Sequence, residues 1–67
     1  MSAFRDLLEQ ARAKGQTKLW FEVDLPAFFA DEQSPSWSCG NELAGDNFAE
    51  AHGRTGEEAL RHLVERL

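Results

Sequence analysis

Apolar side chains at helical spacing mark the start of the chain. Ser2 is a good N-cap residue, and Gly15 supplies a left-handed residue that ends a helix. The pattern predicts a helix over residues 3–14. Its apolar stripe recurs at i, i+3, i+4 and i+7 and consists of Phe4, Leu7, Leu8 and Ala11.

A second helical pattern closes the sequence. Thr55-Gly56-Glu57-Glu58 has the form of a capping box, in which Thr55 caps the backbone and Glu58 returns to the Thr55 amide. Glu57 and Arg61 form an i,i+4 pair in the favourable order. We expect a helix over residues 56–66, with an apolar stripe of Ala59, Leu60, Leu63, Val64 and Leu67.

Between these helices the hydrophobic period changes to two. Residues 17–25 alternate, which is typical of a strand with one apolar face, and Pro26 ends this strand or confines it to a sheet edge. The apolar positions are Leu19, Phe21, Val23 and Leu25. The positions between them, which are mostly charged, are Lys18, Trp20, Glu22 and Asp24.

Two further strands are predicted, with less regular patterns. Residues 27–33 fit either a short helix opened by Pro26 or a loop. A second strand is expected over 37–43, with a bulge or turn at Gly40-Asn41. Residues 44–47 have the composition of a hairpin turn, and a third strand is expected over 48–52.

The element order α-β-β-β-α predicts one small α+β domain over residues 1–67. Both helices should pack on one face of a three-stranded antiparallel sheet. A core of this size contributes only about 3–5 kcal/mol of net stability, so a homodimer or burial against a larger partner would offset it. Cys39 is the only cysteine, which excludes an internal disulfide. With no signal segment or apolar membrane span, this favours the cytoplasm.

The passage from Asn47 to Leu60 contains Gly-Arg-Thr-Gly-Glu-Glu-Ala-Leu. It resembles the last strand, turn and capped helix of HicB-type antitoxin domains, which run β-β-β-α. Residues 19–24 and 37–43 would then correspond to the two earlier strands. The resemblance covers residues 18–67 and implies an antitoxin or regulator that binds a small basic toxin. The family's Pro-Asp-Leu-Pro-Gly-Cys passage is missing, and the N-terminal helix is additional.

Charge is distributed unevenly along the chain. Residues 21–53 contain seven acids and no lysine or arginine, so the negative net charge of −5 comes from this block, which the first twenty residues offset by about +2. Such a block attracts cationic partners and repels phosphate, so we expect a larger protein with a basic surface as partner, and no direct nucleic-acid binding. The alternative is a solvated surface that confers solubility. The acids are Glu22, Asp24, Asp31, Glu32, Glu42, Asp46 and Glu50.

Trp20 lies on the polar side of the first predicted strand. A tryptophan among charges is typical of an interface anchor, although partial cover of that sheet face would also explain it. Trp37 is expected in the core. The candidate partner-binding residues are Trp20, Glu22, Asp24, Asp31, Glu32, Asp46 and Glu50.

No catalytic or metal-binding pattern is evident. Cys39, His52 and His62 lack the short recurring spacing of zinc ligands, and His62 is placed to pair with Glu58. A Cys39–histidine nucleophile has no supporting motif. Phosphate-binding glycine loops are absent from the sequence, and we expect neither an enzyme nor a cofactor.

The leading hypothesis is therefore a small acidic protein-binding module. In size and charge it looks like phage-encoded inhibitors of bacterial defence complexes, anti-CRISPR proteins among them, which would occlude or mimic nucleic acid at a basic surface. The alternatives are the HicB-like antitoxin and a structural homo-oligomeric subunit.

Overall fold

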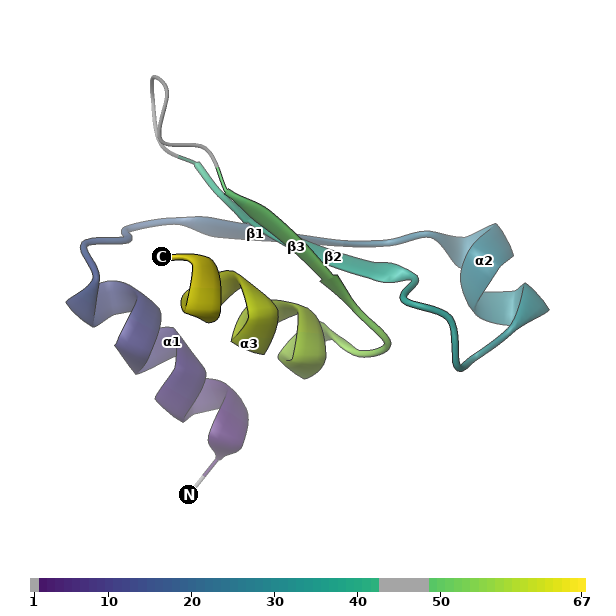
Figure 1. The fold of residues 1–67 in the computed structure, drawn as a ribbon, viewed down its shortest axis with the longest axis horizontal. Helices are drawn as coiled ribbons and strands as arrows, with labels where there is room; N and C mark the ends of the chain where they lie inside the picture. The colour runs from purple at the N-terminus through teal and green to yellow at the C-terminus, as the bar shows by residue number, and fades with distance from the viewer. Residues whose placement is uncertain (1, 43–48) are drawn as a thin grey trace.

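The computed structural model describes residues 2–42 and 49–67, and it is an α+β fold (Figure 1). A three-stranded antiparallel sheet is combined with a helix at each end of the chain, as predicted, and with a short third helix. The elements are α1 (Ala3–Ala13), β1 (Leu19–Val23), α2 (Leu25–Ala30), β2 (Trp37–Asn41), β3 (Glu50–Gly53) and α3 (Gly56–Arg66).

Both long helices begin and end close to the predicted positions. The Ser2 hydroxyl accepts a hydrogen bond from the Arg5 amide at 3.4 Å, and Gly15 has a φ of 92° after the last turn of α1. At the start of α3, Thr55 Oγ1 accepts from the Glu58 amide at 3.0 Å. These caps satisfy amides that have no partner within their helices.

The capping box differs from the prediction in its second half. The Glu58 carboxylate accepts from the Arg54 amide at 3.4 Å and from Arg54 Nε at 3.3 Å, not from the Thr55 amide. Arg54 carries a cation as well as an amide, so the carboxylate gains a charge-assisted bond by reaching one residue further back.

The sheet has the order β1-β2-β3 and an uninterrupted register. Trp20 lies opposite Gly40, and Gly40 lies opposite Glu50. The predicted bulge or turn at Gly40-Asn41 is therefore wrong. Gly40 serves a packing purpose instead, because a Cβ there would lie 2.3–2.7 Å from three atoms of the Trp20 indole.

The segment after β1 forms α2, the helical alternative for residues 27–33. Asp24 Oδ1 accepts from the Ala27 amide at 3.1 Å and caps the helix. Pro26 occupies the first turn, where its missing N–H costs nothing. Leu25 therefore belongs to α2 and not to the preceding strand. Asp31 ends the helix and accepts from the Gln33 amide at 3.0 Å.

The second and third strands are shorter than predicted, ending at Asn41 and beginning at Glu50. The predicted turn over residues 44–47, with Leu43 and Phe48, lies outside the described residues.

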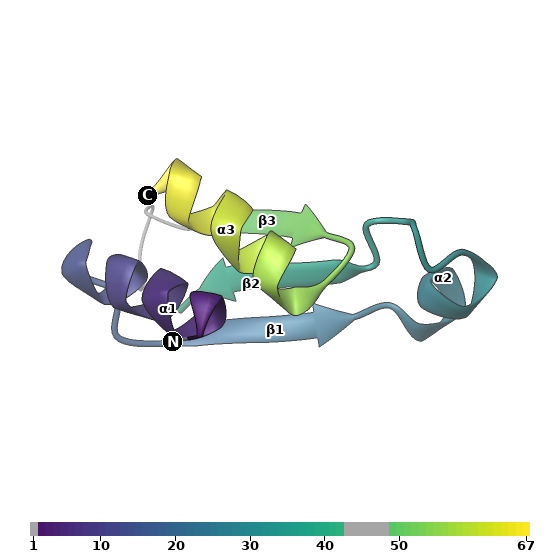
Figure 2. The same ribbon diagram turned by 90° about the horizontal axis from the view of Figure 1, so that it is seen from below.

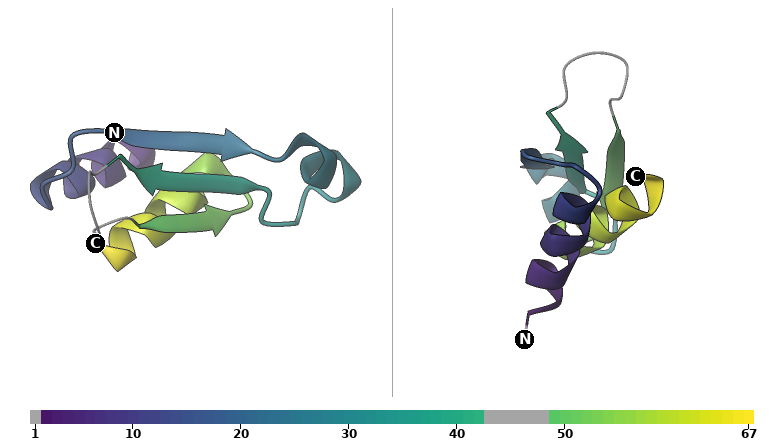
Figure 3. Two further views of the ribbon diagram at one scale, coloured as in Figure 1. Left: turned by 90° about the horizontal axis from the view of Figure 1, so that it is seen from above. Right: turned by 90° about the vertical axis from the view of Figure 1, so that its left-hand side faces the viewer.

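One face of the sheet carries both α1 and α3, as Figures 2 and 3 show. Cys39 and Ala51 point from the sheet into the interface with the helices and are completely buried. Trp37, expected in the core, packs partly buried against it. The core consists of Leu7, Ala11, Cys39, Ala51, Ala59, Leu60, Leu63 and Val64.

The connection from β3 to α3 is tightly packed. A Cβ at Gly53 would lie 2.5 Å from the Ala59 backbone nitrogen, so only glycine lets the helix approach this closely. Among the described helices, none has the length and apolar character needed to cross a membrane.

Candidate protein-binding surface

The sheet face opposite the two long helices is uncovered in the described structure (Figure 3). Side chains alternate along each strand, so one alternate set lines this surface, which we call the open face. It contains two carboxylates and no lysine or arginine among its strand residues. The open face consists of Trp20, Glu22, Ser38, Gly40, Glu50 and His52.

Trp20 lies on the open face, as the period-two pattern predicts, and its indole ring crosses Gly40. Because the ring rests on the strand beside it, Trp20 is half-buried and its orientation is fixed by packing. A preorganised aromatic ring loses little conformational entropy on binding. The packing against Gly40 thus leaves the exposed part of Trp20 available as a rigid contact.

A polar network connects β2 and β3 on the same surface. Ser38 Oγ lies 2.9 Å from His52 Nδ1, and His52 Nε2 lies 4.0 Å from Glu50 Oε1. The second distance exceeds a hydrogen bond, and the His52 side chain is 56% exposed. The Ser38 contact is close, but the imidazole is exposed and Glu50 is too far to orient it by a hydrogen bond, as the base that activates a serine requires.

The predicted site residues divide into two groups. Trp20, Glu22 and Glu50 lie together on the open face, whereas Asp24, Asp31 and Glu32 lie around α2 at the end of the sheet. Asp46 lies outside the described residues.

The acidic block remains uncompensated by lysine or arginine in the parts that the structure describes. Each arginine ion pair uses an acid from outside the block. The Glu50 carboxylate lies near His52, and Arg66 reaches the backbone carbonyl of Glu50 and forms no ion pair with its side chain among the described residues. The block therefore keeps its negative charge at the surface, although Asp24 and Asp31 also bind backbone amides. The three arginine pairs are Arg5–Glu9, Arg54–Glu58 and Arg61–Glu57.

Cys39 is poorly suited to nucleophilic chemistry. Its side chain is completely buried, and burial raises the pKa of the thiol to about 11. The thiolate is the reactive form, so Cys39 is held in its inert form at neutral pH.

The histidines do not assemble a metal site either. His62 Nδ1 donates to the His52 carbonyl at 2.7 Å, instead of pairing with Glu58 as predicted. Over residues 2–42 and 49–67, no group of three or more potential ligands is placed to hold a metal ion.

The exposure of Leu25 and Phe29 does not follow from the sequence pattern. They are 55% and 77% exposed and occupy one side of α2 at i,i+4 spacing. Pro26 is the sequence signal for this helix and the Asp24 cap appears in the structure, while the period-two pattern through Leu25 also fits a strand.

Comparisons with protein-family models, curated proteins and solved structures give no match to this chain.

Proposed function

We propose that this protein is a cytoplasmic protein-binding module whose open face docks on a cationic surface of a larger protein. One observation carries the proposal: Trp20, Glu22 and Glu50 share a sheet face that no described segment covers and that has no lysine or arginine among its strand residues. The carboxylates would be electrostatically complementary to a cationic surface, and the Trp20 ring would serve as the aromatic anchor of the contact.

In its more specific form, the proposal is an inhibitor that competes with nucleic acid. Basic grooves that bind nucleic acid recognise phosphates by charge, and surface carboxylates can occupy the same positions. The partner would be a bacterial defence complex and the source a phage. The net charge of −5 supports this form.

The test uses three single variants that change the net charge equally. Glu22→Lys alters the open face, Glu32→Lys alters the α2 end, and Glu65→Lys alters α3 outside the acidic block. We expect Glu22→Lys to weaken binding by roughly threefold to tenfold at low salt, with less effect at high salt. Affinity capture from host lysate at two salt concentrations, with quantification of captured proteins, measures this.

The Glu65→Lys variant is the matched control, because α3 is on the other side of the sheet. A salt-sensitive partner retained by this control and reduced with Glu22→Lys supports the proposal. Equal capture by all three variants, or capture that salt does not alter, contradicts it.

The HicB-like antitoxin is the second candidate. It is favoured by the order β1, β2, β3, α3 and by antiparallel pairing of consecutive strands, although α2 is inserted between the first two strands. Co-purification with a small basic toxin encoded beside this protein would support the antitoxin over the inhibitor.

A further inference from the structure

The outer edge of β1 is free for pairing in the described structure. The Asp24 amide donates to the Ser36 carbonyl at 2.9 Å, so the even-numbered positions of this strand face β2. The N–H and C=O groups of Leu19, Phe21 and Val23 therefore point away from the sheet. No described segment pairs with them, and Figure 3 shows β1 as an outermost strand.

On the other edge of the sheet, the outward carbonyls of β3 are already bonded by side chains of α3. His62 Nδ1 donates to the outward carbonyl of His52 at 2.7 Å, and Arg66 Nη1 donates to the outward carbonyl of Glu50. These two side chains are one turn apart on α3. Unpaired strand edges attract other strands, and only the edge of β1 lacks such cover among the described strands.

We propose that a second copy of this chain pairs antiparallel with β1, placing Phe21 of each copy opposite the other at a two-fold axis. The same strand then meets itself, as a two-fold interface requires. Leu19 lies opposite Val23 of the second copy on the helix-bearing side. On the open side, Lys18 lies opposite Asp24 and Trp20 lies opposite Glu22.

Neighbouring registers fit less well. Placing Glu22 on the axis sets two like charges opposite each other, which is unfavourable. Placing Trp20 on the axis leaves Val23 opposite the polar Thr17. Cross-strand complementarity therefore selects the register centred on Phe21.

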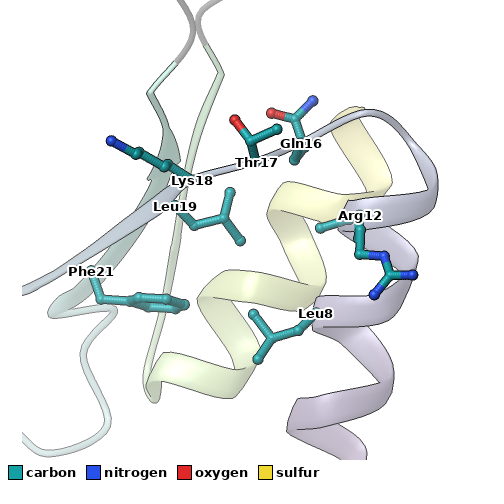
Figure 4. A pocket seen from close by; sticks show the side chains of 8 residues that line it. Leu8, Arg12, Gln16, Thr17, Lys18, Leu19 and Phe21 are labelled. Carbon is teal, nitrogen blue, oxygen red and sulfur yellow. The ribbon is translucent and has the colours of Figure 1, made fainter.

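A groove beside β1 adds apolar surface to this interface. In the proposed register, Asp24 lies opposite Lys18, so α2 lies next to residues 16–18 of the second copy. Those residues border a pocket of about 280 Å³ between α1 and β1 (Figure 4). Its apolar lining consists of Leu8, Ala11, Leu19 and Phe21.

The exposed side of α2 is complementary to this groove. Leu25 and Phe29 of one copy would be buried against the apolar lining of the groove on the other copy. Glu32 would then approach Arg12, which lines the same groove. A five-residue strand pair alone is marginal in water, so contact by α2 supplies area that the strands lack.

The dimer would join the two sheets into one and make the two open faces continuous. This inference is independent of the proposed function, because it rests on the β1 edge and α2 and not on a cationic partner.

Sedimentation of the full chain over a concentration series tests the interface. Val23→Pro removes an outward N–H and no hydrogen bond within the sheet, and proline is tolerated at a strand edge. We expect dimerisation to weaken by about tenfold or more, with an unchanged far-ultraviolet circular dichroism spectrum. Val23→Thr keeps the N–H and serves as the matched control that remains dimeric.

Cross-linking tests the register. Residues in a hydrogen-bonded antiparallel pair have Cα atoms about 5.5 Å apart, within disulfide range. Under mild oxidation, Phe21→Cys should form a covalent dimer much faster than Glu32→Cys, while the buried Cys39 common to both stays reduced. A monomeric wild-type chain, a dimer that survives Val23→Pro, or equal cross-linking by both cysteine variants would overturn the proposal.

Discussion

Gly40 determines the position of the aromatic ring on the open face. Its lack of a side chain lets the Trp20 indole lie against β2. The sequence showed a glycine within a strand but not the ring across from it, because the pairing of distant strands decides which residues meet. A local turn signal was therefore misread, while the period-two placement of Trp20 was confirmed.

Replacing Gly40 with alanine should displace this ring. The new methyl group would overlap the indole, and overpacking of this kind costs about 1–3 kcal/mol. We expect Gly40→Ala to lower the free energy of unfolding in urea and to shift Trp20 fluorescence to longer wavelength, measured in a Trp37→Phe background. Unchanged stability and emission would show that the indole does not rest there.

Cys39 makes stability depend on alkaline pH. Its pKa is about 11 in the folded chain and near 9.0 when unperturbed. Well below pH 9 the thiol is protonated in both states and has no effect, and the loss begins as pH approaches the unperturbed pKa. As pH rises from 9 to 11 the unfolded chain loses this proton while the folded chain retains it, so stability falls.

Urea unfolding at a series of pH values measures this loss. Cys39→Ala removes the titrating group, so its stability should decline less steeply over the same interval, even though its stability at neutral pH is lower. Parallel pH profiles for the two proteins would contradict the expected role of the buried thiol.

At the scale of elements, the two long helices were the most predictable parts. Their stripes, caps and ends depend on residues within four positions of each other, so local sequence is sufficient. Arg54 was missed as the partner of Glu58 because the capping-box pattern specifies the residue types and not which amide the carboxylate selects.

The two N-caps should differ in strength. The Thr55 hydroxyl accepts from the Glu58 amide at 3.0 Å, whereas the Ser2 hydroxyl accepts from the Arg5 amide at 3.4 Å. In addition, α3 contributes more residues to the core than α1. We expect Thr55→Ala to lower the unfolding free energy by about 1 kcal/mol and Ser2→Ala to lower it less. Chemical denaturation of both variants checks the order, and a larger loss from Ser2→Ala would contradict it.

The short helix α2 shows where sequence patterns conflict. Leu25 continues the alternation of the strand before it, but the Asp24 cap and Pro26 favour a helix start at the same place. The helix forms because α2 extends beyond the end of the sheet (Figure 1), where no described strand lies beside it to pair with an extended backbone.

At the scale of the whole molecule, the fold spreads the described acids of the block along the sheet and beyond its end. Glu22 and Glu50 lie on the open face, Asp24 follows Glu22 on the same side of β1, and Asp31 and Glu32 lie at the α2 end. The charge of the block is given by composition, but which of its acids share a face depends on strand pairing, which composition does not contain.

The close approach of α3 to Gly53 also determines what this position tolerates. A Cβ there would lie 2.5 Å from the Ala59 backbone nitrogen and 2.8 Å from the Glu58 carbonyl carbon, and backbone atoms cannot turn aside as the end of a side chain can. Any side chain at residue 53 would therefore displace the first turn of α3 from the end of β3, and the core residues that this turn carries would be displaced with it.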